Sequence, residues 1–273
     1  MADDFRRPVE TFTARTPRVV SASKLHRAAA RRKAGRFLVE GFNSVDAALR
    51  AGAVVEVFAT DSAIDRHREL LDEAVASGRP VSIIDDSAAA SLSETVTTAG
   101  LFAVCASDAA LSPMERAIAA GVESGVLVVP VECNDPGNAG TIIRMADALG
   151  AGGVILAGDS VDPLGGKVVR SSAGSVFNVP VARERDVDAV LRAVAEAGFT
   201  TLATTMDADV VLGRDELPTG PVAWLFGNEA HGLPGDVLAG AGARVSIPIR
   251  GGAESLNLAT AAAMCLWETA RGQ

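Results

Sequence analysis

The feature that most constrains this chain is a regular alternation of short apolar runs with segments of helical periodicity. From residue 126 onward, the runs VLVVPV, GGVILAG, VAWLFG and RVSIPI have the length of strands, and helix-length segments stand between most of them. Strands that are apolar along their whole length are typical of parallel sheets buried on both faces. The pattern therefore predicts an α/β fold with a mostly parallel sheet covered by helices on both sides.

The first third of the chain carries a shorter series of the same kind. RFLVE, VVEVFA, VSII and LFAVCA are predicted to be strands, and SASKLHRAAARRKA at 21–34 is predicted to be one helix with a serine cap. The following SDAALSP has the composition of a linker. We therefore expect a small α/β domain followed by a larger one.

Composition agrees with this division and excludes several classes of protein. The chain has 273 residues, of which 48% are hydrophobic and 22% charged. No apolar run approaches the roughly 20 residues that span a bilayer, and the first ten residues lack the apolar core of a signal peptide. We expect a cytoplasmic protein that does not contact a membrane. The three cysteines and three histidines are scattered, which predicts buried free thiols and no bound metal.

The distribution of charge is uneven. The net charge is −9, but residues 1–36 hold ten Lys or Arg and three acids, so this segment carries +7 and the rest −16. A basic segment on an acidic body is typical of a protein that contacts phosphate locally. A helix face that only meets solvent explains the same pattern, and charge alone does not separate the two interpretations.

Three loops rich in Gly and Asn follow strong strands: NDPGNAGTIIR at 134–144, GNEAHG at 227–232 and IPIRGGAESLN at 247–257. Ligands of parallel α/β sheets bind beyond the carboxyl ends of the strands, so these loops are expected to build one pocket. Two familiar nucleotide motifs are absent. DSVDPLGGKVV lacks the first glycine and the Ser or Thr of a phosphate-binding Walker A loop, and no GxGxxG follows the first strand of either domain.

Arg144 stands out in the first of these loops. With Asn138 as the expected helix cap, the following helix places Ile142, Ile143 and Ala146 in a broad apolar arc and Arg144 on the other side. From this helix alone, a charged residue on a solvated face is the favoured explanation of Arg144.

The three loops together resemble the signature motifs of the SpoU (TrmH-type) RNA ribose methyltransferases, the branch of the SPOUT superfamily that methylates 2′-hydroxyls. The resemblance rests on Asn138 with Arg144 six residues later, on GNEAHGL, on IPIRGGAESLN, and on KVVRSSAGSVFNVPV between the first two. It covers roughly residues 125–270. LVEGFNSVDAAL, after the basic helix, resembles the ribosomal-protein-like substrate-binding domain of the family.

This resemblance implies a domain organisation and a fold. It divides the chain into an N-terminal extension at 1–17, an RNA substrate-binding domain at 18–106, a linker at 107–120 and the SpoU methyltransferase domain at 121–273. It also implies that the last domain is threaded into a deep trefoil knot, that S-adenosylmethionine is the cofactor, and that the protein is a homodimer. For the dimer we expect the last helix to offer the small residues Ala259, Ala262 and Ala263 together with Leu266.

The resemblance also assigns the site residues. Gly227, Ile247 and Leu256 are expected to contact the cofactor through their backbone. The reaction site is expected to be lined by Asn138, Arg144, Glu229, Ser255 and Asn257.

The roles of these side chains follow from the chemistry. A ribose hydroxyl is protonated at neutral pH, and a guanidinium group is a poor general base. We therefore interpret Arg144 as a fixed positive charge that stabilises the developing alkoxide and orients a phosphate, and a transiently neutral Arg144 acting as base is the alternative. Asn138 and Asn257 position ribose or cofactor, and Ser255 orients a phosphate or hydroxyl. Glu229 anchors either its own loop or Arg144.

The leading hypothesis is thus an S-adenosylmethionine-dependent RNA 2′-O-ribose methyltransferase acting on ribosomal RNA. The alternatives are a transfer RNA 2′-O-methyltransferase, a non-catalytic RNA-binding protein of the same fold, and a nucleotide-dependent enzyme of another class such as an oxidoreductase. The absent dinucleotide motif counts against the last of these.

Overall fold

The computed structural model describes residues 10–272 and divides into two compact units. The first unit runs up to Ala110 and also includes Leu164–Asn178, and the second comprises Leu111–Pro163 and the chain from Val179 onward. Residues 1–9, which belong to the expected N-terminal extension and hold two of the arginines of the basic segment, lie outside the described residues.

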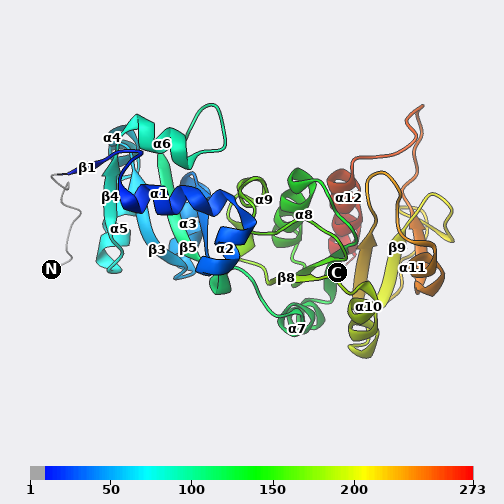
Figure 1. Ribbon diagram of the computed structural model, residues 1–273. Helices are drawn as coiled ribbons and strands as arrows, with labels where there is room; N and C mark the ends of the chain where they lie inside the picture. The colour runs from blue at the N-terminus through cyan, green and yellow to red at the C-terminus, as the bar shows by residue number, and fades with distance from the viewer. Residues whose placement is uncertain (1–9, 273) are drawn as a thin grey trace. The chain divides into compact units, whose positions relative to one another are not determined.

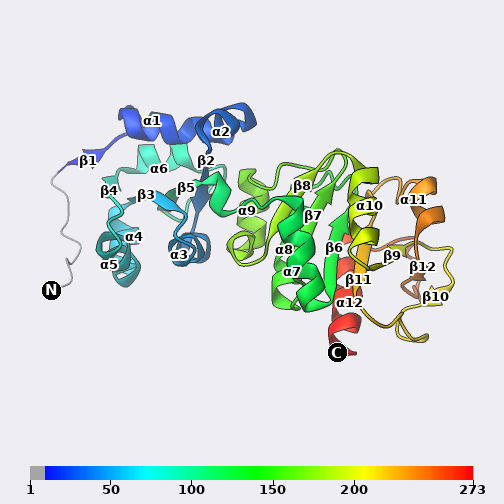
Figure 2. The same cartoon turned by 90° about the horizontal axis from the view of Figure 1, so that it is seen from below.

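The first unit is built on a five-stranded mixed sheet in the order β1-β4-β3-β5-β2. Its strands are β1 Thr11–Phe12, β2 Arg36–Glu40, β3 Val54–Ala59, β4 Val81–Ile84 and β5 Leu101–Ala106. Its helices are α1 Pro17–Ser23, η1 Lys24–His26, α2 Ala28–Ala34, α3 Phe42–Arg50, α4 Asp61–Arg66, α5 Arg68–Ala76, α6 Asp86–Leu92 and η2 Ser107–Ala109. Figure 2 shows α1, α2 and α6 on one face of this sheet and α3, α4 and α5 on the other.

The segment 21–34 does not form the single helix predicted for it. The backbone of Arg27 is extended, and this residue interrupts the helical path between η1 and α2. The buried Arg31 donates from Nη1 to the carbonyls of Leu25 and His26, at 2.9 Å each, which stabilises the break. A side chain thus satisfies carbonyl groups that a continuous helix would have bonded internally.

The basic segment is part of this unit's fold. Val19, Ala22 and Leu25 from α1 and η1 are buried against Phe58 and Phe102 of the sheet. Five exposed cations of this segment lie between η1 and the start of β2, and we call them the η1–β2 cations: Lys24, Arg27, Arg32, Lys33 and Arg36. Within residues 10–272 none of these five side chains makes an ion pair.

The segment Leu164–Asn178, which the sequence suggested would belong with residues 121–273, packs in the first unit. It forms α9 Gly166–Ser172 and η3 Ser175–Phe177. Phe177 stacks on Phe37 of β2 with ring centroids 5.8 Å apart, and Arg170 forms an ion pair of 3.0 Å with Glu94. These contacts join residues far apart in sequence, so local periodicity gave no sign of them.

The second unit contains a seven-stranded sheet in the order β10-β12-β9-β11-β6-β7-β8, and every strand pairing in it is parallel. The strands are β6 Val126–Pro130, β7 Gly153–Ala157, β8 Val181–Glu184, β9 Thr200–Thr204, β10 Val210–Val211, β11 Val222–Phe226 and β12 Ala243–Ser246. The expected parallel α/β sheet is therefore confirmed.

Helices cover both faces of this sheet. They are α7 Met114–Ser124, α8 Pro136–Ala148, α10 Val187–Glu196, α11 Gly235–Gly240 and α12 Leu258–Arg271. Figure 1 shows α8 and α12 on one face and α7 and α10 on the other. Helix α7 begins inside the range 107–120 that was expected to be a linker, because Ala117 and Ile118 provide an apolar side that packs on the sheet. Among the described residues, no helix is long and apolar enough to cross a membrane.

The last helix uses its small residues within the chain. Ala259, Ala262 and Leu266, which were expected to face a second copy, are buried, and α12 packs against α8. Trp224 of β11 donates its Nε1–H to the Thr269 hydroxyl at 2.9 Å. The apolar side chains that α12 leaves exposed are Met264 and Trp267.

Candidate active site

The three predicted loops meet at the side chain of Asn138. Its amide nitrogen donates to Glu229 Oε1 at 2.8 Å, and its amide oxygen accepts from Asn257 Nδ2 at 2.9 Å. The strands that lead into these loops are neighbours or near neighbours, in the order β12-β9-β11-β6. Since parallel strands point their carboxyl ends to one edge, one buried amide can join all three loops.

Asn138 is not the cap of its helix. Asp135 is the N-cap of α8, and its carboxylate accepts from the backbone N–H of Asn138 at 2.8 Å, with Pro136 in the first turn. Asn138 lies inside the first turn and is only 9% exposed. The helix therefore begins earlier than predicted, which turns the side chain of Asn138 inward, where both of its polar atoms find partners.

Glu229 anchors its loop through Asn138, although the residue itself lies on an exposed part of the loop. The thiol of Cys133 lies 3.9 Å from Oε1 of the same carboxylate. Burial, with the nearby Glu229 and Asp135 carboxylates, raises the pKa of Cys133 to about 12. Cys133 is therefore a protonated thiol and a weak donor at neutral pH, not a nucleophile. All three cysteines are free and buried, as expected.

Asn257 has two roles at the start of α12. Its side-chain oxygen accepts from the backbone N–H of Thr260 at 3.2 Å and caps the helix, while its amide nitrogen reaches Asn138. The orientation of the last helix is thus tied to the first loop of the site.

A cavity of about 240 Å³ lies beside this junction. All three residues predicted to contact the cofactor line it, namely Gly227, Ile247 and Leu256, and Glu229 and Ser255 line it as well. Thr204, Thr205 and Met206, which were not among the predicted site residues, lie at the carboxyl end of β9 and form another wall. Strand β9 lies between β11 and β12, which lead into the second and third predicted loops. The end of a strand in that place is the signal that points to these three residues.

Gly227 is required by the close approach of two backbone segments. A Cβ atom at this position would lie 2.2 Å from the carbonyl carbon of Gly232 and 2.3 Å from the nitrogen of Leu233. Any larger residue would force the 227–232 loop outward and change the shape of the cavity.

Arg144 lies apart from these contacts. It is exposed on α8, while Ile142, Ile143 and Ala146 are fully buried on the apolar side as predicted. Among residues 10–272 its side chain makes no hydrogen bond or ion pair, and it does not line the cavity. Glu229 is therefore the partner of Asn138 and not of Arg144.

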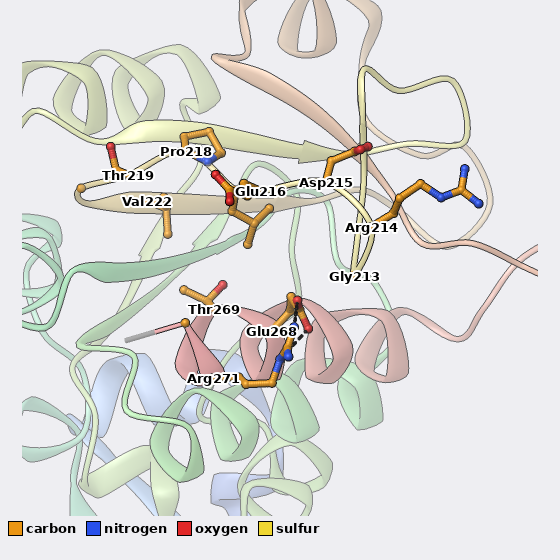
Figure 3. A pocket seen from close by; sticks show the side chains of 13 residues that line it. Gly213, Arg214, Asp215, Glu216, Pro218, Thr219, Val222, Glu268, Thr269 and Arg271 are labelled. Atoms are coloured by element: carbon orange, nitrogen blue, oxygen red, sulfur yellow. Dashed lines mark hydrogen bonds and ion pairs between the residues drawn. The ribbon is translucent and has the colours of Figure 1, made fainter.

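A larger cavity, of about 630 Å³, is formed by the loop 213–220 and the end of α12 (Figure 3). None of the predicted site residues lines it. Two of its charged groups, Glu268 and Arg271, form an ion pair with each other and are thereby satisfied. We place the candidate site at the smaller cavity, because the hydrogen-bonded loops converge there. Among the described residues, no group of His, Cys, Asp and Glu is arranged to hold a metal ion.

Comparisons with known proteins agree with this geometry. The SpoU rRNA Methylase family matches residues 125–267, and the MRM3-like substrate binding domain matches residues 16–103. The chain is 30% identical over 257 residues to the 23S rRNA (guanosine(2553)-2'-O)-methyltransferase RlmP of Bacillus subtilis, covering 93% of this chain and 96% of that one.

Two solved structures share the whole architecture. The AdoMet-bound rRNA methyltransferase from Sinorhizobium meliloti superposes with a TM-score of 0.83 at 30% identity, covering 96% of this chain and 98% of that one. The SpoU methyltransferase AviRb from Streptomyces viridochromogenes, in complex with AdoMet, gives a TM-score of 0.80 at 30% identity, covering 94% and 98%. By its matched domains, its relatives and its three converging loops, the chain belongs to the SpoU rRNA methylase family.

Proposed function

We propose that this protein transfers a methyl group from S-adenosylmethionine to the 2′-hydroxyl of a ribose in ribosomal RNA. The observation that carries the proposal is the junction of Glu229, Asn138 and Asn257 beside a cavity lined by the predicted cofactor residues. The names of the relatives, which are rRNA methyltransferases, support the choice of RNA.

The chemistry of the cavity lining suits S-adenosylmethionine. Val245, Ile247 and Leu256 provide apolar walls, while Thr204 and Ser255 provide hydroxyl groups. The carboxylate of Glu229 lies at the wall, where a positively charged ligand is favoured. S-adenosylmethionine, when bound, supplies an electrophilic methyl group on a sulfonium centre. The residues that we expect to hold it are Gly227, Ile247 and Leu256.

The geometry changes the roles that we propose for the two asparagines. Both polar atoms of the Asn138 side chain are used by Glu229 and Asn257, so we propose that Asn138 fixes these two residues and does not itself bind ribose. Ser255 lines the cavity and is the hydroxyl that we propose to orient the target ribose or its phosphate. The ribose proton leaves to water or to a phosphate oxygen.

Arg144 is proposed as the fixed positive charge of the reaction. It is exposed and without a carboxylate partner among the described residues, so its guanidinium is available to the phosphate and the developing alkoxide of an RNA substrate. A permanently charged group in this role orients the nucleophile and lowers the energy of the anion without accepting its proton.

We also propose that the protein acts as a homodimer in the cytoplasm and that the second unit is threaded into a trefoil knot. Met264 and Trp267, which are 42% and 61% exposed on α12, offer an apolar face for a second copy. The return of α12 onto α8 and Trp224 is compatible with the knotted path. Light scattering at micromolar concentration is expected to give the mass of a dimer, and Trp267→Glu is expected to give that of a monomer. A wild-type monomer would contradict the dimer.

The decisive experiment maps 2′-O-methyl groups in total RNA from cells with and without this protein. We expect the loss of one site in ribosomal RNA and its return when purified protein and S-adenosylmethionine are added. Loss of a site in transfer RNA alone would favour the alternative substrate, and no loss at all would favour a non-catalytic RNA-binding protein. Calorimetry with S-adenosylmethionine and with NAD tests the oxidoreductase alternative, because only the methyltransferase is expected to bind the former.

A further inference from the structure

The backbone of Glu132, at the end of β6, adopts a conformation that non-glycine residues rarely use. Its φ is +54°, in the left-handed region, where the Cβ atom of an L-residue is crowded. Its side chain makes no hydrogen bond or ion pair within the described part of the chain, so the side chain does not explain the conformation. Something in the surrounding backbone must hold it there.

Two contacts restrain this backbone: the N–H of Glu132 donates to the carbonyl oxygen of Ala157 at 3.0 Å, and Asn228 binds the carbonyl oxygen of Glu132. The side-chain amide nitrogen of Asn228 is the donor of the second bond, at 2.8 Å. The rest of Asn228 is fixed by its own loop: its side-chain oxygen accepts from the N–H of Ala230 at 2.8 Å, and its backbone exchanges hydrogen bonds of 3.0 and 2.9 Å with Gly232. The donor that meets Glu132 is therefore held rigidly.

This bond and the bond between Asn138 and Glu229 join the same two loops. Asn228 and Glu229 are consecutive in the second loop, while Glu132 and Asn138 bracket the entry into α8. Release of Glu132 would let residues 132–135 relax, and Asp135, the cap of α8, would move with them. Cys133 is held separately by Ser160 and Val161, so we expect the contact that Asn228 makes to share in setting the position of Asn138 relative to Glu229.

We propose that Asn228 is a positioning residue of this site: it holds Glu132 in the left-handed conformation and so fixes the first loop against the wall of the cavity. The inference rests on the proposed methyl transfer for its effect on rate, but not for its effect on structure. Asn228 also lines the cavity, so cofactor affinity is measured for each variant, and the role proposed here acts through Glu132 and not through the reacting atoms.

The test uses two substitutions of Asn228. Asn228→Ala removes both polar atoms, whereas Asn228→Asp keeps the oxygen that accepts from Ala230 and replaces the donor that meets Glu132. We expect both variants to lower single-turnover methyl transfer to ribosomal RNA about tenfold, since a left-handed non-glycine residue costs of the order of one tenfold step in an equilibrium. Wild-type transfer by Asn228→Asp would overturn the proposal. It would show that the bond from Ala230 to the side-chain oxygen is enough for activity and that the bond to Glu132 is not needed.

The sharper test is rescue. Glycine adopts positive φ freely, so Glu132→Gly should keep the loop in place without the bond from Asn228. Glu132→Gly alone is expected to transfer at nearly the wild-type rate, and the double variant with Asn228→Ala is expected to recover to within about threefold of it. The matched control is Ala173→Gly, which relieves the other positive φ of a non-glycine residue, +50°, in the first unit. Rescue by Ala173→Gly as strong as that by Glu132→Gly would show general stabilisation and overturn the proposal.

A structural readout keeps this inference separate from the proposed function. If wild-type protein neither binds S-adenosylmethionine nor transfers methyl groups, the proposed function fails. The free energy of unfolding in urea still tests Asn228, because Asn228→Ala should be less destabilising when Glu132 is glycine. Equal destabilisation in the two backgrounds would show that Asn228 and Glu132 are not coupled.

Discussion

Replacing Arg144 with alanine distinguishes a catalytic charge from an exposed one. The side chain is exposed on α8 and has no hydrogen bond or ion pair within residues 10–272, so its removal leaves no buried group unsatisfied. The apolar side of the helix, with Ile142, Ile143 and Ala146 fully buried, is unchanged by the substitution. The fold and the cavity should therefore survive.

The two interpretations predict very different magnitudes. Substitutions at exposed positions of this kind change the free energy of unfolding by less than about 0.5 kcal/mol, and alanine is a good helix former. If Arg144 stabilises charge that develops only in the transition state, its loss should lower the rate of methyl transfer by about 10²–10³, or roughly 3–4 kcal/mol. An effect on rate this much larger than the effect on stability cannot come from unfolding.

The assay is single-turnover transfer to ribosomal RNA from cells that lack the protein, with S-adenosylmethionine affinity measured by calorimetry. We expect cofactor affinity to stay unchanged, because Arg144 does not line the cavity. Arg144→Lys keeps the charge but loses the planar pair of donors, so partial recovery indicates a point charge and no recovery indicates a two-pronged contact. Arg192→Ala is the matched control, since Arg192 is exposed on α10, on the other face of the sheet. Transfer by Arg144→Ala at the rate of this control would refute the catalytic role.

Four further predictions concern other parts of the molecule. Gly227→Ala should abolish S-adenosylmethionine binding in calorimetry, since its Cβ would lie 2.2 Å from the backbone of Gly232, and unchanged affinity would mean that the cofactor binds elsewhere. Asn138→Ala removes two side-chain hydrogen bonds, of 2.8 and 2.9 Å, and should cost about 1–3 kcal/mol in urea unfolding as well as lowering transfer. Replacing the five η1–β2 cations with glutamine should flatten the plot of log affinity for RNA against log salt concentration. The slope should fall by about 0.7–0.9 for each phosphate that the protein no longer neutralises, and an unchanged slope would mean that these residues only meet solvent. Burial raises the pKa of Cys133 from about 9 to about 12, so this thiol loses its proton at lower pH in the unfolded chain than in the folded one. The free energy of unfolding should therefore fall as pH rises between these values, and Cys133→Ala should weaken that dependence.

Much of the second unit could be predicted because its pattern is local. Fully apolar strands spaced by helices determine a buried parallel sheet, and the shared direction of the strands determines that the three Gly- and Asn-rich loops meet at one edge. The strand pattern predicted one pocket built by the three loops, the family resemblance added Gly227, Ile247 and Leu256 as residues around it, and all three line one cavity in the structure. The family, too, was identifiable from the motifs in these loops.

Contacts between distant residues were decided only by the tertiary structure. The pairs Asn138 with Glu229 and Asn257 with Asn138 span 91 and 119 positions of the chain, and no local period encodes such distances. The capping pattern made Asn138 resemble a helix cap, but Asp135 caps the helix, and Asn138 turns inward because its amide finds two partners there. The small residues of α12 suggested a surface for a second copy, yet Ala259 and Ala262 are buried within the chain, where α12 packs against α8. Sequence periodicity sets which side of a helix is apolar, whereas the fold sets which neighbour covers that side.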